Sequence, residues 1–216
     1  YTGQTACYAT ALMRLYGYTD TQALKWGMSS WDTATAGPWN GKKTSNPAQG
    51  NSNWNSNAAP TTPTFTTTPF IALTSTDGNT LLKQRVQAIV DEVVADGGFK
   101  SVANTELLAN PTEYYINNFF DEPHYTGFGH VAGAYRIKPI SFESNVINLD
   151  PSAKIVTYCY TGQTSAVVTA CLRVLGYDAY SVSFGMNGFY YDNPFWTGIS
   201  NHWGDKYIVG LPYATK

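Results

Sequence analysis

The chain has 216 residues, of which 43% are hydrophobic and 15% aromatic, enough to bury the core of one large domain or two small ones. Its formal net charge of −2 excludes a chain-wide electrostatic attraction to nucleic acid or to an anionic membrane. Charged residues make up only 13% of the chain, a low share that favours an exported or periplasmic protein over a cytoplasmic one.

The chain begins with one copy of an internal repeat. Residues 1–18, YTGQTACYATALMRLYGY, match residues 160–177, YTGQTSAVVTACLRVLGY, without a gap. After a one-residue gap the match resumes, because GMSSW (27–31) corresponds to GMNGF (185–189). Self-similarity of this length indicates two copies of one strand–loop–helix module.

The first copy of the module is incomplete. The second copy is preceded by KIVTYC (154–159), an apolar strand that ends in a cysteine, whereas the first begins at the tyrosine that would follow such a cysteine. A terminus inside a folding unit favours a parent chain whose first domain began upstream, with circular permutation as the alternative. Because half a domain exposes apolar surface, we expect the missing N-terminal fragment, the second domain or a second copy of the chain to cover it.

The segment between the copies changes character near residue 69. Residues 41–68 are rich in Asn, Ser, Thr and Pro without helical or strand periodicity, which predicts a linker, pinned by Trp39 and Trp54. PFIALT (69–74) predicts a short strand. LLKQRVQAIVDEVVADGG (81–98) predicts a helix, because its apolar residues recur at helical spacing before a Gly-Gly stop.

Further strands and helices alternate from there to the second copy. VANTELLANP (102–111) predicts a short helix capped by Asn104 or Thr105, and YYINNFF (114–120) predicts a buried strand. KIVTYC is another buried strand, TSAVVTACLRVLGY (164–177) a helix that stops at Gly176, and SVSFGM (181–186) a last strand. This alternation predicts an α/β fold with a parallel sheet covered on both faces.

Three cysteines, Cys7, Cys159 and Cys171, show neither a CxxC motif nor paired Cys/His spacing. This pattern argues against a disulfide framework and a zinc site, so we expect no bound metal, no cofactor and at least one free thiol. No stretch approaches the roughly 18 apolar residues of a membrane span. The first ten residues also lack the basic start and apolar block of a signal peptide.

Cys159 is the candidate reactive group. It is predicted to lie at the carboxyl end of a buried parallel strand, where open α/β sheets bind ligands. Backbone N–H groups of the following turn and the dipole of the next helix would stabilise a thiolate there. Gly162 would let the chain curl, and the hydroxyls of Thr161 and Thr164 could donate to sulfur or to a bound oxyanion.

These residues resemble the rhodanese family. CYTGQTS, followed by an apolar helix that ends in LGY, is similar to the CxxGxT or CxxGxR active-site loop of rhodaneses. HYTGFGHVAGAYRIKP (124–139) resembles the family's GHIPGAxxIP segment, and GMNGF and GMSSW resemble its GGxxxW segment. The resemblance implies a rhodanese-like parallel sheet flanked by helices on both faces. Residues 69–216 would form a complete domain, and residues 1–40 the C-terminal half of a first one.

The resemblance also implies a persulfide cycle, in which Cys159 takes a sulfane sulfur from a small donor and passes it to a thiol or a cyanide-like acceptor. The loop that would bind the donor or its anion consists of Tyr160, Thr161, Gly162, Gln163, Thr164 and Ser165. Asn118, Phe120 and Phe189 would border the pocket, with Tyr160 and Phe189 near the thiol. Related phosphatases use a loop one residue longer that ends in arginine, so a phosphatase is disfavoured. We expect His130 to fix a turn by hydrogen bonding, and Cys7 and Cys171 to be core residues.

The sequence departs from the family at two points. The family's DxR, on the strand before the GH segment, stands here as Asn118-Phe119-Phe120, and the loop from Cys159 to Ser165 contains no Lys or Arg. Without that Coulombic attraction, a neutral or protein-borne persulfide donor fits at least as well as thiosulfate. The alternative function is a binding or sensory module that holds an anion or a partner segment at the same loop. A third is a redox thiol that cycles through sulfenic acid.

Overall fold

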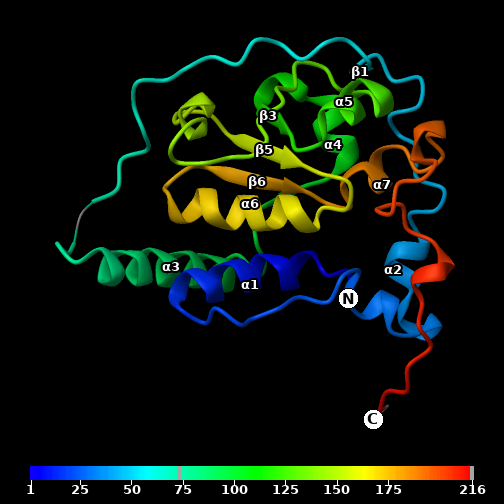
Figure 1. The fold of residues 1–216 in the computed structure, drawn as a ribbon, viewed down its shortest axis with the longest axis horizontal. Coiled ribbons are helices and arrows are strands. Elements are labelled where there is room, and N and C mark those ends of the chain that lie inside the picture. The colour runs from blue at the N-terminus through cyan, green and yellow to red at the C-terminus, as the bar shows by residue number, and fades with distance from the viewer. Residues whose placement is uncertain (73, 215–216) are drawn as a thin grey trace.

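A computed structural model describes residues 1–72 and 74–214. Its centre is a four-stranded sheet in the order β2–β6–β5–β3, and every neighbouring pair is parallel (Figure 1). The strands are β2 (Ser101–Val102), β3 (Tyr115–Asn118), β5 (Ile155–Tyr158) and β6 (Ala179–Val182). The register places Thr157 of β5 between Asn117 and Ser181. The carboxyl ends of β5 and its neighbours therefore meet at one edge of the sheet.

Alternate residues of the strands pack into two separate hydrophobic cores, one on each face of the sheet. Val156 and Tyr158 of β5 pack with α4 (Asn104–Ala109), α5 (Glu122–Phe128) and α7 (Gly185–Phe189). Ile155 packs on the other face with Leu172 of α6 (Gln163–Val174). The prediction of an α/β fold with a parallel sheet flanked by helices on both faces is confirmed, because the strands alternate as a two-sided sheet requires.

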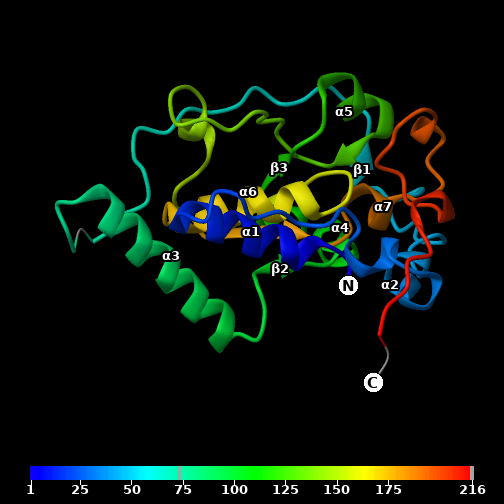
Figure 2. The ribbon, with the colours of Figure 1, turned by 60° about the horizontal axis from the view of Figure 1, so that its bottom comes forward.

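Two further helices form a layer outside α6. These are α1 (Gln4–Tyr16) and α3 (Gly78–Ala95), which pack against α6 through a third core cluster (Figures 1 and 2). The helix predicted over 81–98 is confirmed as α3, and it begins earlier because the Asp77 side chain accepts a hydrogen bond from Thr80 N–H at 2.7 Å. The first copy of the repeat thus lies directly beneath the helix of the second copy.

Residues 41–68 contain ordered structure that a linker need not have. β1 (Trp54–Asn55) pairs antiparallel with β4 (His130–Val131), and Ala48 is buried in the same core as Tyr158. Trp54 packs on Phe189, with ring centroids 5.2 Å apart. This segment is therefore attached to the face of the sheet that carries α4 and α5.

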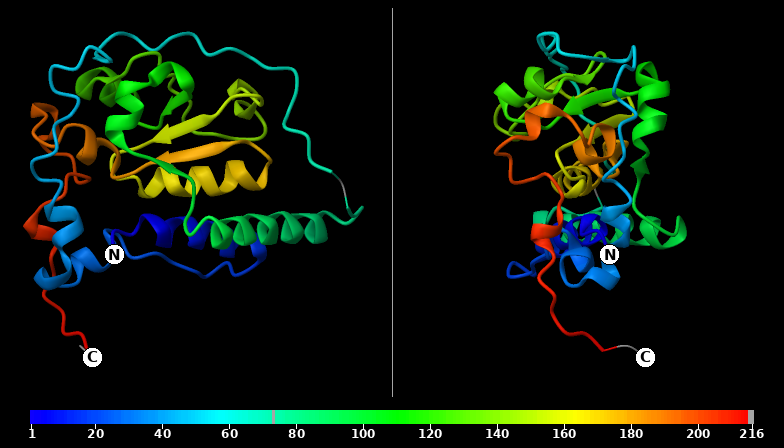
Figure 3. Two further views of the ribbon diagram at one scale, coloured as in Figure 1. Left: turned by 180° about the vertical axis from the view of Figure 1, so that it is seen from behind. Right: turned by 90° about the vertical axis from the view of Figure 1, so that its right-hand side faces the viewer.

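Tryptophan side chains join the N-terminal region to the C-terminal region. Trp26 and Trp39, of which Trp39 lies in α2 (Gly37–Asn40), are buried against Trp203, and both chain ends lie on this side of the molecule (Figure 3). Short 3-10 helices complete the fold: Gly27–Ser30, Thr33–Thr35, Pro111–Glu113, Val146–Asn148, Pro194–Trp196 and Asp205–Tyr207. Among the described residues, no helix has the length and apolar character needed to cross a membrane.

Three local predictions were wrong. Residues 69–72 and 74 form no strand, and residue 73 lies outside the described part; Pro69 offers no N–H, and Phe70 points to solvent. The cap of α4 is Ala103, because the Asn104 side chain instead donates to the carbonyl of Gly185 at 3.0 Å. The last strand, predicted over 181–186, spans 179–182, because the backbone turns sharply at Phe184 with φ of 61°.

The two copies of the repeat adopt the same local conformation. Each helix is preceded by a left-handed glycine, Gly3 at φ 81° and Gly162 at φ 76°. Each following turn contains a left-handed aromatic residue, Trp26 at φ 66° and Phe184 at φ 61°. Because a bulky residue rarely adopts positive φ, the shared backbone at Trp26 and Phe184 marks the two segments as equivalent units.

Candidate active site

The candidate site is the loop that joins β5 to α6. β5 is fully buried between β3 and β6, so Cys159 emerges from the centre of the sheet at its carboxyl end. The Cys159 carbonyl accepts a hydrogen bond from Met186 N–H at 2.9 Å. A Cβ at Gly185 would collide with that carbonyl, so this close approach requires glycine. The turn before α7 therefore fixes the loop from one side.

The thiol of Cys159 points to the start of α6. Its Sγ accepts a hydrogen bond from Ser165 N–H at 3.4 Å and lies 3.6 Å from Ser165 Oγ. Ser165 Oγ lies 2.8 Å from Ser181 Oγ on the neighbouring strand β6. An N–H group in the first turn of a helix carries partial positive charge, and this one points at the sulfur.

The two threonine hydroxyls of the loop do not contact the sulfur, and their donation to a bound oxyanion stays a prediction. Thr161 Oγ accepts a hydrogen bond from Gln163 N–H at 3.2 Å, which closes the turn, and Thr164 is exposed to solvent. The sulfur contact predicted for Thr161 or Thr164 is made by Ser165 instead. Ser181, which the sequence analysis did not single out, supports Ser165. A polar residue within a buried strand was the signal that could have identified it.

Tyr160, next to the cysteine, is held by a polar cluster at the start of α5. Its hydroxyl accepts a hydrogen bond from Asp121 N–H at 3.0 Å and lies 2.5 Å from Nδ1 of His124. Lys138 donates to the Asp121 carboxylate at 2.8 Å, and this bond lowers the pKa of Asp121. Burial raises the pKa of the Tyr160 hydroxyl. His124 is thus part of the support of the loop.

Three residues predicted to border a pocket are fully buried. Asn118, Phe120 and Phe189 surround the side chains of Tyr158 and Tyr160. Phe120 stacks on Tyr160 with centroids 4.7 Å apart, and Asn118 donates to the Tyr158 hydroxyl at 2.9 Å. These three side chains pack against the loop from the protein core. That they line a substrate pocket stays a prediction.

The open side of the loop is covered by the first copy of the repeat. Gln163 Nε2 donates to the carbonyl of Thr2 at 2.9 Å, and Phe184 N–H donates to Gln4 Oε1 at 2.8 Å. Only 2% of Cys159 is exposed. A donor therefore reaches the sulfur only when groups around the loop move.

The remaining candidates have mainly structural roles. His130 is buried, stacks on Tyr125 and contacts the Tyr125 carbonyl at 3.2 Å, which confirms that it fixes a turn. Cys7 and Cys171 are free, half-buried thiols whose pKa values are raised by burial, so they are only partly core residues. Within the described part of the chain, no group of three His, Cys, Asp or Glu residues could hold a metal ion.

Comparison with known proteins identifies the class of this domain. Residues 116–192, which run from β3 through the Cys159 loop to just beyond α7, match the family model described as Rhodanese-like domain. The fold agrees, and this part of the chain is therefore a rhodanese-like domain. No curated protein matches the chain.

Solved structures that match this chain share little sequence with it. A rhodanese-related protein from Thermoplasma volcanium is 21% identical over 41% of this chain and 87% of its own, with a TM-score of 0.37. A protein of unknown function from Rhodopseudomonas palustris, described as a possible tyrosine phosphatase, is 18% identical over 54% and 91%, with a TM-score of 0.35. An NAD-dependent persulfide reductase from A. fulgidus is 17% identical over 50% of this chain and 18% of its own, with a TM-score of 0.36.

Proposed function

We propose that this protein is a sulfurtransferase that moves a sulfane sulfur through a persulfide on Cys159. The observation that carries the proposal is the position of Sγ, which accepts the N–H of Ser165 in the first turn of α6 at the carboxyl end of the central strand. A persulfide formed at this sulfur would extend toward the same partial positive charge.

The proposed cycle has two displacement steps. The Cys159 thiolate attacks the sulfane sulfur of the donor, the S–S bond of the donor breaks, and the donor leaves as a thiolate that takes up a proton. An acceptor nucleophile then attacks the outer sulfur of the Cys159 persulfide, and the Cys159 thiolate leaves. Sulfur is transferred without net oxidation, so no further reductant is required.

The surroundings of the loop favour an uncharged or protein-borne donor. The segment from Cys159 to Ser165 contains no Lys or Arg, so thiosulfate would be held by backbone amides and hydroxyls alone. The buried position of the sulfur points the same way, because a partner protein that displaces Thr2–Gln4 would open the site as it delivers sulfur.

Intact-mass analysis tests the proposal. The protein is exposed at neutral pH to thiosulfate, mercaptopyruvate or a small-molecule persulfide, and we expect a gain of one sulfur atom, about 32 Da, from at least the persulfide. Cys159→Ser should gain nothing, and Cys171→Ser, the matched control, should be loaded like the wild type. A gain that persists in Cys159→Ser contradicts the proposal.

The second candidate is a binding module that holds an anion or a partner segment at the same loop. It is favoured by the burial of Cys159 and by the hydrogen bonds that close the loop. This function predicts no sulfur gain from any donor and the same partner affinity in wild type and Cys159→Ser. Isothermal titration with inorganic phosphate and thiosulfate distinguishes the two, because only the binding module retains affinity without turnover.

A further inference from the structure

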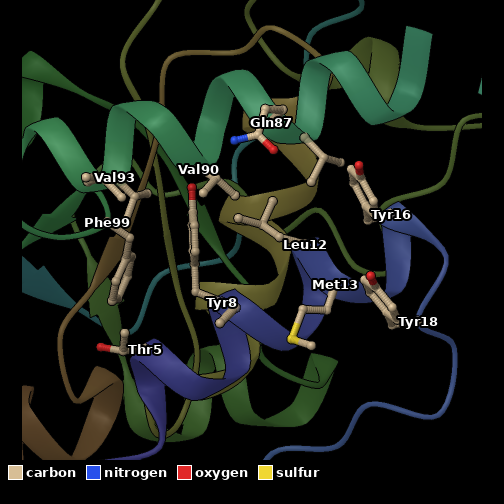
Figure 4. A pocket seen from close by; sticks show the side chains of 13 residues that line it. Thr5, Tyr8, Leu12, Met13, Tyr16, Tyr18, Gln87, Val90, Val93 and Phe99 are labelled. Atoms are coloured by element: carbon tan, nitrogen blue, oxygen red, sulfur yellow. The ribbon is translucent and has the colours of Figure 1, made fainter. Parts of the chain in front are cut away.

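One face of α1 is apolar and uncovered. Met13 is 44% exposed and Tyr18 is 60% exposed, and both lie beside Tyr16 on the side of the helix turned away from α6. With α3 they border a groove of about 350 Å³ that is lined mainly by hydrocarbon and aromatic rings (Figure 4). Exposed apolar patches of this kind mark interaction surfaces on soluble proteins.

The second copy of the repeat shows what covers the equivalent face. Leu172, the counterpart of Met13, is 1% exposed, and Tyr177, the counterpart of Tyr18, is 4% exposed. They pack with Val168 and Leu175 of the same segment against residues of the half-domain that precedes it, namely Tyr115, Tyr135, Ile137, Ile140, Val146, Leu149, Ala153 and Ile155. The two matching helix faces therefore differ mainly in whether a segment like 99–159 lies over them.

The two grooves along these helices correspond residue by residue. The α1 side of the groove contains Tyr8, Ala9, Leu12, Met13 and Tyr16. The counterparts on α6 line a second groove, which is closed by Phe119 and the segment 139–146 of the preceding half-domain. In the first copy no such segment is present among the described residues, and α3 covers only one rim.

The segment after α1 shows the same difference between the two copies, because its counterpart in the second copy is a strand. Residues 21–24 align with β6, which pairs with β5 and β2. In the described structure they form no strand, and Leu24 is largely exposed, whereas its counterpart Val182 is buried. Among the described residues, this segment therefore lacks the neighbouring strands that β6 has.

We propose that the exposed face of α1 and residues 21–24 bind a parallel-sheet half-domain of the same kind as residues 99–159, which completes a second rhodanese-like domain. The loop Tyr1–Thr5 would then follow the last strand of that sheet as the Cys159 loop follows β5. This inference does not depend on sulfur transfer.

The side chains of α1 match this occupant. The buried residues on this side are Ser165, Thr169 and Leu172 of α6 and Tyr177, three residues beyond its end. The same positions in the first copy are Ala6, Thr10 and Met13 of α1 and Tyr18, two residues beyond its end. Leu-to-Met exchange conserves volume, and the remaining differences are small, so a sheet shaped for α6 also fits α1. A second copy of this chain fits less well, because its own 99–159 segment is already covered by its own α6.

The experiment duplicates residues 99–159 directly before Tyr1 in the full chain, so that the appended Cys159 precedes Tyr1 as it precedes Tyr160. We expect oxidation of Met13 by peroxide to slow by roughly tenfold or more, and the amides of residues 21–24 to become protected from exchange. Met186, which is fully buried, reports in the same spectrum that the original domain remains folded.

The matched control carries Ile155→Asp in the appended segment only, and there Met13 should oxidise as fast as in the 216-residue chain. Two results would overturn the proposal. One is an unchanged Met13 rate with unprotected 21–24 amides while Met186 stays protected. The other is a dimer of the unextended chain in which Met13 is already protected and which Met13→Glu dissociates.

Discussion

At the scale of single residues, the candidate site is a sulfur atom whose neighbours are backbone and hydroxyl groups. The motif around Cys159 predicted where this thiol lies, because local spacing places a cysteine between a buried strand and a glycine turn. Ser181 and His124 were not predicted as neighbours, because they reach the loop from β6 and α5. Local sequence patterns do not predict such contacts, because the residues are distant in the chain and meet only in the folded sheet.

The hydroxyl of Ser165 is expected to position the thiolate. Ser165→Ala keeps the N–H donor but removes the Oγ contact, so we expect sulfur loading to slow about tenfold, or about 1.4 kcal/mol in activation free energy. It also leaves Ser181 Oγ without its closest partner, which costs about 1–3 kcal/mol of unfolding free energy. Intact mass measured on samples quenched at successive times gives the loading rate, and urea denaturation gives the free energy of unfolding.

The double variant Ser165→Ala/Ser181→Ala separates these roles. Removing both hydroxyls should recover part of the lost stability, because no buried hydroxyl stays unpaired, but it should not recover the loading rate. Recovery of the rate together with the stability would show that Ser165 acts only through packing.

At the scale of elements, α1 and α6 demonstrate that equal sequence and equal local structure do not imply equal burial. Both helices begin after a left-handed glycine, and a glycine with positive φ, Gly17 or Gly176, follows within two residues of the end of each. The periodicity that predicted α6 also applies to α1, but only α6 lies on a sheet. Burial energy, rather than helix formation, is what distinguishes the two copies.

This difference predicts unequal costs for equivalent truncations. Leu172→Ala should lower the free energy of unfolding by about 2–5 kcal/mol, because it opens a cavity in a close-packed core. Met13→Ala should change it by no more than about 0.5 kcal/mol, because Met13 is exposed in this chain. Urea denaturation followed by circular dichroism compares them, and equal losses would mean that Met13 is covered in solution.

At the scale of the whole molecule, the indole cluster determines how the N-terminal region sits on the loop. Trp39 donates from Nε1 to the Thr2 carbonyl at 3.1 Å, and Trp203 donates to Asn40 at 3.0 Å. These bonds hold Thr2 where it accepts the hydrogen bond from Gln163. Access to Cys159 is therefore coupled to the packing of residues distant in sequence.

Trp39→Ala should uncover the thiol. Loss of a buried tryptophan costs about 3–5 kcal/mol, and here it also removes the anchor of Thr2. We expect alkylation of Cys159 by iodoacetamide, mapped by peptide mass, to become faster relative to Cys171. Trp54→Ala is the control, because Trp54 packs on Phe189 and not on the N-terminal region. Equal acceleration in both variants would indicate general unfolding.

Stability is expected to fall on mild acidification. Burial lowers the pKa of both His130 and His202 below the ordinary value of 6.5, so the unfolded chain binds protons at a higher pH than the folded protein does. The stability that these neutral rings contribute is complete above pH 6.5 and is lost progressively as the pH falls below it. Urea midpoints at pH 7.5 and 5.5 should differ less in His130→Asn than in the wild type.

The sequence by itself determined the α/β class, the repeat, the helices α1, α3, α4 and α6, the strands β3 and β5, and the place of Cys159 between β5 and α6. Each of these is encoded in periodicity or in a short motif whose residues contact one another locally. Only the tertiary structure revealed that Thr2–Gln4 cover the Cys159 loop, that Ser181 supports Ser165, and that residues 41–68 pair with the domain. It alone showed that α1 exposes the face that α6 buries. These features depend on which distant segments meet, and burial is a property of that assembly rather than of any one segment.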